Sequence, residues 1–150
     1  MGKVLKSRLL AIDGSKVMVL KKLGKSLRYT LPGGVKKKKE TEKEALIRET
    51  SEEIALELAN DKVHFYFSKV KVTRNGAVQK NYYHTSLKQR KIRILENHKF
   101  EKLAWVNWKE VIGYMDKSDR SAVETYFRIY KGKNKKTNKN ECTISSRIAM

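Results

Sequence analysis

Apolar and polar residues in the first part of the chain form short runs that indicate strands. The run from residue 4 to residue 23, VLKSRLLAIDGSKVMVLKKL, is interrupted by Asp13-Gly14. An Asp-Gly pair between two apolar runs is typical of a two-residue hairpin turn, so this pattern predicts two antiparallel strands. A short extended piece, RYTL, then leads into Pro32-Gly33-Gly34, where helix and regular strand are both disfavoured.

The pattern changes to a helical period from about residue 40 to residue 54. Leu46 or Ile47, Thr50 and Ile54 fall on one side of a helix with about 3.6 residues per turn. We therefore expect one amphipathic helix here, with these residues facing the core.

A second hairpin is predicted around Asn75-Gly76. The runs on either side of it, KVHFYFSKVKV and AVQKNYYHTSLK, are long and rich in aromatic and β-branched residues. The shorter runs KIRIL, at 91–95, and KLAWV, at 102–106, each predict a further strand.

Two helices are predicted near the end of the chain. Asn107 can cap a short helix over WKEVIGYM, and Ser118 or Asp119 can cap a longer one that runs to about Tyr130. Gly132 is expected to end it. The packing face of this last helix would be formed by Ala122, Tyr126 and Ile129.

This order of elements predicts one α/β domain over residues 1–131, built as a mixed sheet flanked by helices. Residues 132–150, GKNKKTNKNECTISSRIAM, lose all periodicity, and we expect a basic, disordered tail there. The total of 150 residues suits one domain with a core but hardly two.

Charge narrows the range of partners. The formal net charge is +19, from 35 Lys and Arg against 16 Asp and Glu, which predicts attraction to nucleotides, RNA or other polyanions. Cys142 is the single cysteine, which excludes an intramolecular disulfide and a Cys-based zinc site. Because no apolar run approaches bilayer-spanning length and the first residues do not resemble a signal peptide, we expect a cytoplasmic protein and no membrane partner.

In so basic a chain, a cluster of acidic residues in RETSEEIAL, residues 48–56, needs a cation. Residues three and four apart share a helix face, so Glu49, Glu52 and Glu53 can reach a single bound ion. The alternative is a solvated acidic face balanced by lysines. Hard oxygen ligands without His or Cys suit Mg²⁺ or Mn²⁺.

The stretch GVKKKKETEKEALIRETSEEIAL resembles the box of the Nudix hydrolase family, G-x5-E-x7-R-E-U-x-E-E-x-G-U with U a bulky apolar residue. The matching positions are Gly34, Glu40, Arg48, Glu49, Glu52, Glu53 and Leu56. Two positions depart from the pattern, since Thr50 replaces U and Ala55 replaces Gly. Thr50 must satisfy a hydroxyl in the core, and Ala55 must either reshape the turn or carry about 1–2 kcal/mol of backbone strain.

The resemblance implies a Nudix-like α/β/α sandwich and a set of site residues. Glu49, Glu52 and Glu53 would hold the divalent ions, helped by the backbone carbonyl of Gly33, and Arg48 would orient these glutamates while pairing with Glu40. The catalytic set would be Arg48, Glu49, Glu52 and Glu53. The implied chemistry is attack of a metal-activated water on a diphosphate linkage.

The general base stays open among several residues. Many family members carry a glutamate shortly before a Trp on a late strand, and here Lys99 occupies that place before Trp105. The substitutes are Glu96, Glu101, His98, or a box glutamate, Glu52 or Glu53.

Lysines and aromatic residues are the candidate substrate contacts. Lys36 and Lys37, in the run 36–39, could bind a polyphosphate, or they could form a solvated loop; Lys21 and Lys22 are further candidates. Tyr83 could stack on a base, as could Tyr66, Tyr82 and Trp105, unless these strand aromatics belong to the core.

Our first hypothesis is an Mg²⁺-dependent hydrolase of a nucleoside diphosphate-linked compound, with a nucleoside triphosphate as the first choice of substrate. The second is a hydrolase of dinucleoside polyphosphates or RNA 5′ ends. The third is a catalytically silent Nudix fold that binds nucleotides or RNA. In each case the basic surface and tail could add nonspecific RNA or polyanion contacts. The pattern does not define an oligomeric state.

Overall fold

A computed structural model describes residues 2–131 of the chain. The expected tail and the expected helix end at Gly132 lie outside the described residues. The strands are β1 (Lys3–Asp13), β2 (Lys16–Lys22), β3 (Tyr29–Thr30), β4 (Gly33–Val35), β5 (His64–Thr73), β6 (Gly76–Ser86) and β7 (Phe100–Asn107). The helices and helical turns are α1 (Glu42–Ile54), η1 (Asn60–Lys62), α2 (Trp108–Val111), η2 (Ile112–Tyr114), α3 (Lys117–Thr125) and the π-helical turn η3 (Tyr126–Tyr130).

The strands form one mixed sheet, as predicted. Its order is β3-β2-β1-β6-β5, with β4 paired to β1 and β7 paired to β2. β1 and β6 run parallel along ten residue pairs, whereas β1 and β2 pair only next to their turn, at Ile12↔Val17 and Asp13↔Lys16. Beyond that point β1 pairs with β4 instead. The two strands therefore separate, and the segment that leads into α1 enters between them.

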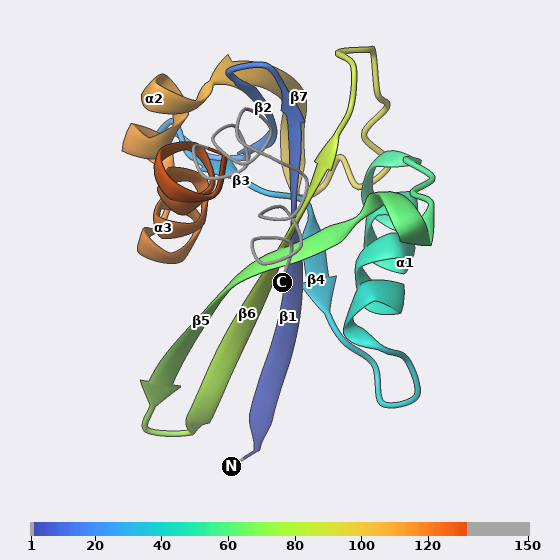
Figure 1. The fold of residues 1–150 in the computed structure, drawn as a ribbon, viewed down its shortest axis with the longest axis vertical. Coiled ribbons are helices and arrows are strands. Elements are labelled where there is room, and N and C mark those ends of the chain that lie inside the picture. Colours follow the sequence, from blue (N-terminus) through green and yellow to red (C-terminus); the bar gives the residue numbers. More distant parts are fainter. Residues whose placement is uncertain (1, 132–150) are drawn as a thin grey trace, which may run out of the picture.

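Both faces of the central strands are buried, because helices cover the sheet on both sides. Leu10 and Ile12 of β1 pack in a core with residues of α3, while Leu9 and Ala11 pack in a second core with residues of α1. The continuous apolar run of β1 is what a strand covered on both faces requires. Figure 1 shows α1 on one side of the sheet and α2 with α3 on the other, which confirms the α/β/α sandwich.

One part of the sheet projects beyond the helices. The first half of β1 and the hairpin of β5 and β6 extend away from both helical layers in Figure 1. Val4, Val70 and Val72 are accordingly exposed. This three-stranded extension presents side chains that no helix covers.

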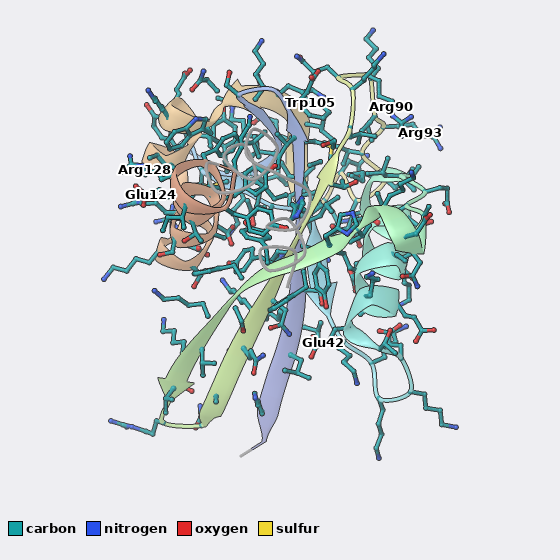
Figure 2. The ribbon with its side chains drawn as sticks, in the orientation of Figure 1. Glu42, Arg90, Arg93, Trp105, Glu124 and Arg128 are labelled. Carbon is teal, nitrogen blue, oxygen red and sulfur yellow. The ribbon has the colours of Figure 1, made fainter. Side chains whose placement is uncertain are left out.

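The predictions of secondary structure differ from the structure in three places. Gly33 and Gly34, where a regular strand was disfavoured, form strand β4 with Val35 and pair with β1. Residues 91–95 form no strand; Ile92 and Ile94 pack on the α1 core while Arg93 points outward, as Figure 2 shows. Buried and exposed side chains alternate in this segment because it is extended and packs on the core with one side, although it pairs with no strand. Helix α3 begins at Lys117 and is capped by Asp116, whose side chain accepts a hydrogen bond from the Asp119 amide; the cap is therefore not Ser118 or Asp119.

The helix face predicted for the end of the chain was also partly wrong. Ala122 and Tyr126 are buried, but Ile129 is 51% exposed because the last turn widens to a π-helix and rotates it outward. No helix within residues 2–131 is both long enough and apolar enough to span a bilayer.

Candidate active site

Helix α1 is fixed at both of its ends. Thr41 caps the start in a capping box, in which its hydroxyl accepts from the Glu44 amide at 3.1 Å and the Glu44 carboxylate accepts from the Thr41 amide at 2.7 Å. At the other end Ala55 adopts the left-handed conformation, with φ 55°. The turn is thus not reshaped, and the surrounding structure carries the strain of a non-glycine residue there.

The buried hydroxyl of Thr50 finds its hydrogen-bond partners within the helix. Thr50 is fully buried, and its hydroxyl donates to the carbonyls of Leu46 at 3.0 Å and Ile47 at 3.1 Å. The helix therefore keeps its packing face despite the polar atom, as expected for a β-branched residue that bonds back to the preceding turn.

Arg48 joins the helix to the loop before it. Its guanidinium binds Glu40 through two bonds, of 2.7 and 3.0 Å, and donates to Glu49 at 2.9 Å and Glu52 at 3.0 Å. A fifth bond, of 3.1 Å, goes to the carbonyl of Val35. The hydrogen bond from Arg48 lowers the pKa of Glu40 to about 2, with help from the Lys37 amide. This planar fork of donors fixes the loop against α1 as a lysine could not.

Glu53 is a buried carboxylate at the centre of the site. It is 3% exposed, and its Oε1 accepts a hydrogen bond of 2.9 Å from the amide of Gly33. Burial raises the pKa of Glu53 to about 7, and the charges of Glu49 and Glu96 act in the same direction. At neutral pH this carboxyl group is close to half protonated unless a cation is bound near it.

The two glycines before α1 allow this close approach. Gly33 has φ +144°, and a side chain on it would collide with the backbone of Ser7 in the neighbouring strand. A Cβ on Gly34 would fall on the carboxylate of Glu49. The loop can therefore bring its backbone against both carboxylates only because it lacks side chains at these positions.

The loop, β1 and α1 line an open cavity of about 500 Å³, together with Lys22, Thr30, Lys99 and Phe100. Glu49 and Glu53 line it together with Gly33, whose carbonyl accepts from Arg8 at 3.4 Å. Glu52 does not line it, because its side chain is 55% exposed and pairs with Arg48. Within residues 2–131, no three acidic, histidine or cysteine side chains converge closely enough to hold a metal ion as the side chains stand.

Of the four candidate substrate lysines, only Lys22 lines this cavity. Lys36 donates to the carbonyl of Lys37 in its own loop, and neither residue lines the cavity. Lys21 pairs with Glu101 at 2.8 Å, whereas its neighbour Lys22 does line the cavity.

The candidate stacking residues are mostly enclosed. Tyr83 is 6% exposed, packs in the α1 core and donates to Glu42 at 3.4 Å. Burial raises its pKa to about 12, with Glu42 as the next cause. Tyr82 is fully buried, and Trp105 packs against the α1 core, inside the molecule in Figure 2. Tyr66 donates to the carbonyl of Ala122 under α3.

Of the three candidates for the general base outside the box, one is near the site. Glu96 is close enough for its charge to raise the pKa of Glu53, and the amide of Leu95 donates to the Glu53 carbonyl at 2.7 Å. Glu101 is bound to Lys21, and His98 is an exposed loop residue that does not line the cavity.

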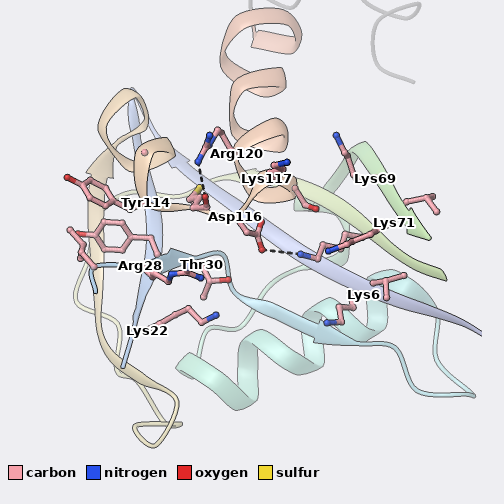
Figure 3. Close-up of a pocket in the computed structure, with 18 of the residues that line it drawn as sticks. Lys6, Lys22, Arg28, Thr30, Lys69, Lys71, Tyr114, Asp116, Lys117 and Arg120 are labelled. Carbon is pink, nitrogen blue, oxygen red and sulfur yellow. Dashed lines mark hydrogen bonds and ion pairs between the residues drawn. The ribbon is translucent and has the colours of Figure 1, made fainter. Parts of the chain in front are cut away.

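Sequence reasoning missed a larger cavity, of about 980 Å³, between the sheet and the start of α3 (Figure 3). It adjoins the smaller cavity, since Lys6, Lys22 and Thr30 line both. Among the described residues its lining includes eight cationic side chains and one acidic one, Asp116. The cations are Lys6, Lys22, Arg28, Lys69, Lys71, Lys80, Lys117 and Arg120. They come from distant parts of the sequence, so only the strand register could have revealed them.

Comparisons with known proteins agree with this architecture. A family model described as the NUDIX domain matches residues 6–126. Among solved structures, a MutT NUDIX hydrolase from Burkholderia pseudomallei aligns with a TM-score of 0.69 at 17% identity, covering 81% of this chain and 96% of that one. A search of curated protein sequences found no match.

Two further solved structures have titles that print an activity. The E. coli dihydroneopterin triphosphate pyrophosphohydrolase aligns with a TM-score of 0.66 at 15% identity, covering 83% of this chain and 93% of that one. A C. elegans Ap4A hydrolase aligns with a TM-score of 0.68 at 16% identity, covering 86% and 98%. At such identities these structures show a shared fold, while the family model extends over most of the chain and includes the whole box. The chain therefore belongs to the Nudix family of hydrolases.

Proposed function

We propose that this chain hydrolyses the diphosphate linkage of a nucleoside triphosphate, with Mg²⁺ or Mn²⁺ as cofactor, and releases a nucleoside monophosphate and pyrophosphate. The observation that carries this proposal is the pairing of two cavities. One is lined by the box residues Glu49 and Glu53 together with cationic side chains, and it adjoins a larger one lined mainly by cations. The cations of the smaller cavity are Lys6, Arg8, Lys22 and Lys99. An anionic substrate can thus lie in the cationic cavity with its phosphates beside the carboxylates.

The donor set fits a hard divalent cation. Glu49, Glu53 and Gly33 line one cavity, and carboxylate and carbonyl oxygens are ligands of the kind that Mg²⁺ and Mn²⁺ prefer. Glu52 can join them if it leaves Arg48, and an exposed ion pair of this kind contributes only about 0.3–0.5 kcal/mol. Burial, and after it the charges of Glu49 and Glu96, raise the pKa of Glu53, and a bound cation would offset both effects.

When bound, the divalent ion supplies a Lewis acid that neutralises phosphoryl charge and lowers the pKa of water. The protein's own residues position the reacting groups. Arg48 holds Glu49 and Glu52 in place, and the Gly33 amide holds Glu53. Among the base candidates we favour Glu96, because it is the loop acid whose charge acts on the pKa of Glu53.

The substitution Glu53→Gln tests this proposal, because glutamine keeps the acceptor for the Gly33 amide and loses the charge. We expect metal-dependent hydrolysis to fall by more than the roughly 10–100-fold caused by losing an outer-shell partner of a metal. Without metal at pH 8, the variant should be more stable by about 2–3 kcal/mol, since a carboxylate with a pKa of about 7 no longer has to ionise in a buried place.

The direction in which stability changes with pH follows from the raised pKa of Glu53. Because the pKa of Glu53 is higher in the folded state than its ordinary value, this group makes the metal-free protein more stable as pH falls from 8 to 5, and Glu53→Gln should remove that gain. Glu57→Gln is the matched control, since Glu57 is exposed and contacts Ser51 outside the cavity. Full turnover by Glu53→Gln, or no turnover of any nucleotide by the parent protein, would contradict the proposal; the second result would favour a silent binding domain.

A further inference from the structure

Arg8 is a cation in the cavity of Glu49 and Glu53 that has no carboxylate partner. It lies on β1, is partly buried and lines this cavity. Within residues 2–131 its side chain takes part in no ion pair. Arginine stays protonated in proteins, so a guanidinium that is partly removed from water needs an anion or a full set of acceptors. Arg8 therefore differs from Arg48, whose guanidinium binds three glutamates.

The hydrogen bonds of the Arg8 side chain are few and long. Its Nη1 donates to the carbonyl of Leu31 at 3.3 Å and to the carbonyl of Gly33 at 3.4 Å. Hydrogen bonds between nitrogen and oxygen are usually about 2.7–3.2 Å long. The Nε of Arg8 is buried and, among the described residues, has no partner. The guanidinium therefore loses little when it leaves these carbonyls, and it gains by binding an acceptor that carries charge.

The bond to Gly33 places Arg8 in competition with a divalent ion. The Gly33 carbonyl is one of the proposed metal ligands, together with Glu49 and Glu53. A carbonyl oxygen has two lone pairs and can accept from Arg8 while it binds a metal, but a guanidinium and a divalent cation on the same oxygen repel each other. Arg8 thus lowers the affinity of this carbonyl for a cation.

The charge of Arg8 also acts on the buried carboxylate of the site. Burial raises the pKa of Glu53 to about 7, and the groups that oppose this rise are the Gly33 amide and the charge of Arg8. A divalent ion at Glu53 would act on this carboxylate in the same direction. Arg8 therefore already supplies part of the positive charge that a metal would bring.

A phosphate group is the acceptor that suits Arg8. The planar fork of a guanidinium binds two phosphate oxygens at once. Three lysines line the same cavity and attract an anion to it, and these are Lys6, Lys22 and Lys99. A phosphate bound to Arg8 neutralises the guanidinium and so reduces its repulsion of a divalent ion. By thermodynamic linkage, the ion then strengthens phosphate binding by the same factor.

We propose that Arg8 binds a phosphate of the substrate and keeps the affinity of the site for its divalent ion low until that phosphate is bound. This inference rests on the proposed function and adds a dependence between its two ligands. Arg8 acts on the substrate directly and on the ion through the Gly33 carbonyl and the charge at Glu53. The ion is then held well only together with the polyphosphate on which it acts.

The metal alone tests one half of the proposal. Electron paramagnetic resonance measures free Mn²⁺ in a titration of the full chain at pH 8, above the pKa of Glu53. We expect Arg8→Gln to bind Mn²⁺ about tenfold more tightly than the parent chain, within the roughly 10–100-fold range over which outer-shell partners change metal affinity. A residue that only holds the loop in place would give the opposite result, because a disturbed loop binds metal less well. Equal or weaker Mn²⁺ binding by Arg8→Gln would overturn the proposal.

The other half is tested without metal. In EDTA, isothermal titration calorimetry measures the affinity for a nucleoside triphosphate in which a methylene group replaces the α–β bridging oxygen. Arg8→Gln should weaken this binding about 10–100-fold, the loss expected when hydrogen bonds to a charged group are removed. Unchanged affinity for this analogue would overturn the assignment of Arg8 to a phosphate.

Arg93→Gln is the matched control, because it removes the same charge from an exposed position that lines neither cavity. It should leave both affinities close to those of the parent chain, since a distant exposed charge is screened. Equal effects of Arg93→Gln and Arg8→Gln on both ligands would reduce Arg8 to its share of the net charge and overturn the proposal. Thermal unfolding in EDTA shows whether each variant is folded. If Arg8→Gln has no unfolding transition, Arg8→Met, which keeps an unbranched side chain, replaces it with the same expectations.

Turnover with Mg²⁺ separates the failure of this inference from the failure of the proposed function. Arg8→Gln should raise the KM for a nucleoside triphosphate. Hydrolysis by the parent chain, combined with parental affinities of Arg8→Gln for both ligands, would leave the proposed function standing and overturn the role of Arg8. If the parent chain hydrolyses no nucleoside triphosphate, the proposed function fails, and with it the assignment of the bound phosphate to a substrate.

Discussion

His84 lies among aromatic rings on the α3 side of the sheet. Its ring centroid is 4.9 Å from that of Tyr130, 5.1 Å from that of Tyr126 and 5.3 Å from that of His64. Within the described part of the chain, its buried Nε2 has no hydrogen-bond partner. Burial, reinforced by His64, lowers the pKa of His84 to about 4. The folded protein therefore holds this imidazole neutral at pH values where an unfolded chain protonates it.

The pH dependence of stability should reflect this residue. Because the folded pKa lies below the ordinary value of 6.5, the unfolded state binds the proton first, and stability falls as pH decreases from about 6.5 to 4. The contribution is about 2–3 kcal/mol. His84→Phe should remove it, as measured by urea unfolding at a series of pH values. His98→Asn, at an exposed loop histidine, is the control and should retain it. An unchanged pH profile in His84→Phe would show that the group titrates normally.

The residue spacing predicted which residues belong to the box better than it predicted the partners of their side chains. Glu49 and Glu53 are four apart and face the same cavity, as expected for one helical row. Glu52 follows Arg48 by four residues, so the same rule pairs it with the guanidinium. The helical spacing alone does not show which glutamate faces the cavity and which pairs with Arg48. That depends on the loop before the helix, which buries Glu53.

Helix α1 carries the glutamates of the candidate site, and it ends at the strained residue Ala55. Its last turn ends at Ala55, whose amide donates to the Ser51 carbonyl at 3.0 Å while its φ is positive. The sequence located this position correctly as a departure from the box, and left open whether the turn or the packing would adapt. The structure keeps the turn, since Ile54 and Leu56 on either side are both buried and fix the path of the chain.

Ala55→Gly should therefore stabilise the protein. Relief of about 1–2 kcal/mol of left-handed strain exceeds the roughly 0.4–1 kcal/mol lost through the greater freedom of glycine in the unfolded chain. The net gain expected from chemical denaturation is about 0.5–1 kcal/mol. Ala59→Gly is the matched control, because Ala59 is exposed with φ −81° and gains nothing from glycine. A loss of stability in Ala55→Gly, equal to that in Ala59→Gly, would show that the turn is unstrained.

The elements that sequence did not reveal depend on pairing between distant strands. Both hairpins were predicted from their turn residues, which are local signals. The parallel pairing of β1 with β6 joins segments more than 70 residues apart, and nothing local specifies its register. That register places Lys6 of β1 beside Lys80 of β6, and β5 adds Lys69 and Lys71 on the same face; we call these four residues the lysine row. Since the lysine row lines the larger cavity, that cavity could not be derived from the sequence.

At the scale of the whole molecule, charged side chains are unevenly distributed. The formal net charge is +19, yet α1 concentrates acids beside a loop of four lysines, and the larger cavity concentrates cations beside one acid. The fold thus places the carboxylates of Glu49 and Glu53 next to a basic wall. Under the proposed function, a substrate that carries several phosphates would complement both, through a bound divalent ion at the carboxylates and directly at the basic wall.

This arrangement predicts that salt stabilises the metal-free protein. Folding brings the lysine row together, so repulsion is larger in the folded state than in the unfolded chain, and screening reduces it. Between 20 and 300 mM sodium chloride in EDTA, the thermal midpoint should rise by about 3–5 °C, which corresponds to roughly 1 kcal/mol for a domain of this size. Surface ion pairs such as Lys21–Glu101 act in the opposite direction, but each contributes little. Lys69→Ala/Lys71→Ala should raise the midpoint at low salt and reduce its further rise with salt. The control Lys62→Ala/Lys88→Ala removes two exposed lysines that line neither cavity, and it should change neither as much. A midpoint that falls with salt would mean that ion pairs outweigh the repulsion, and that the lysine row is already neutralised within the folded chain.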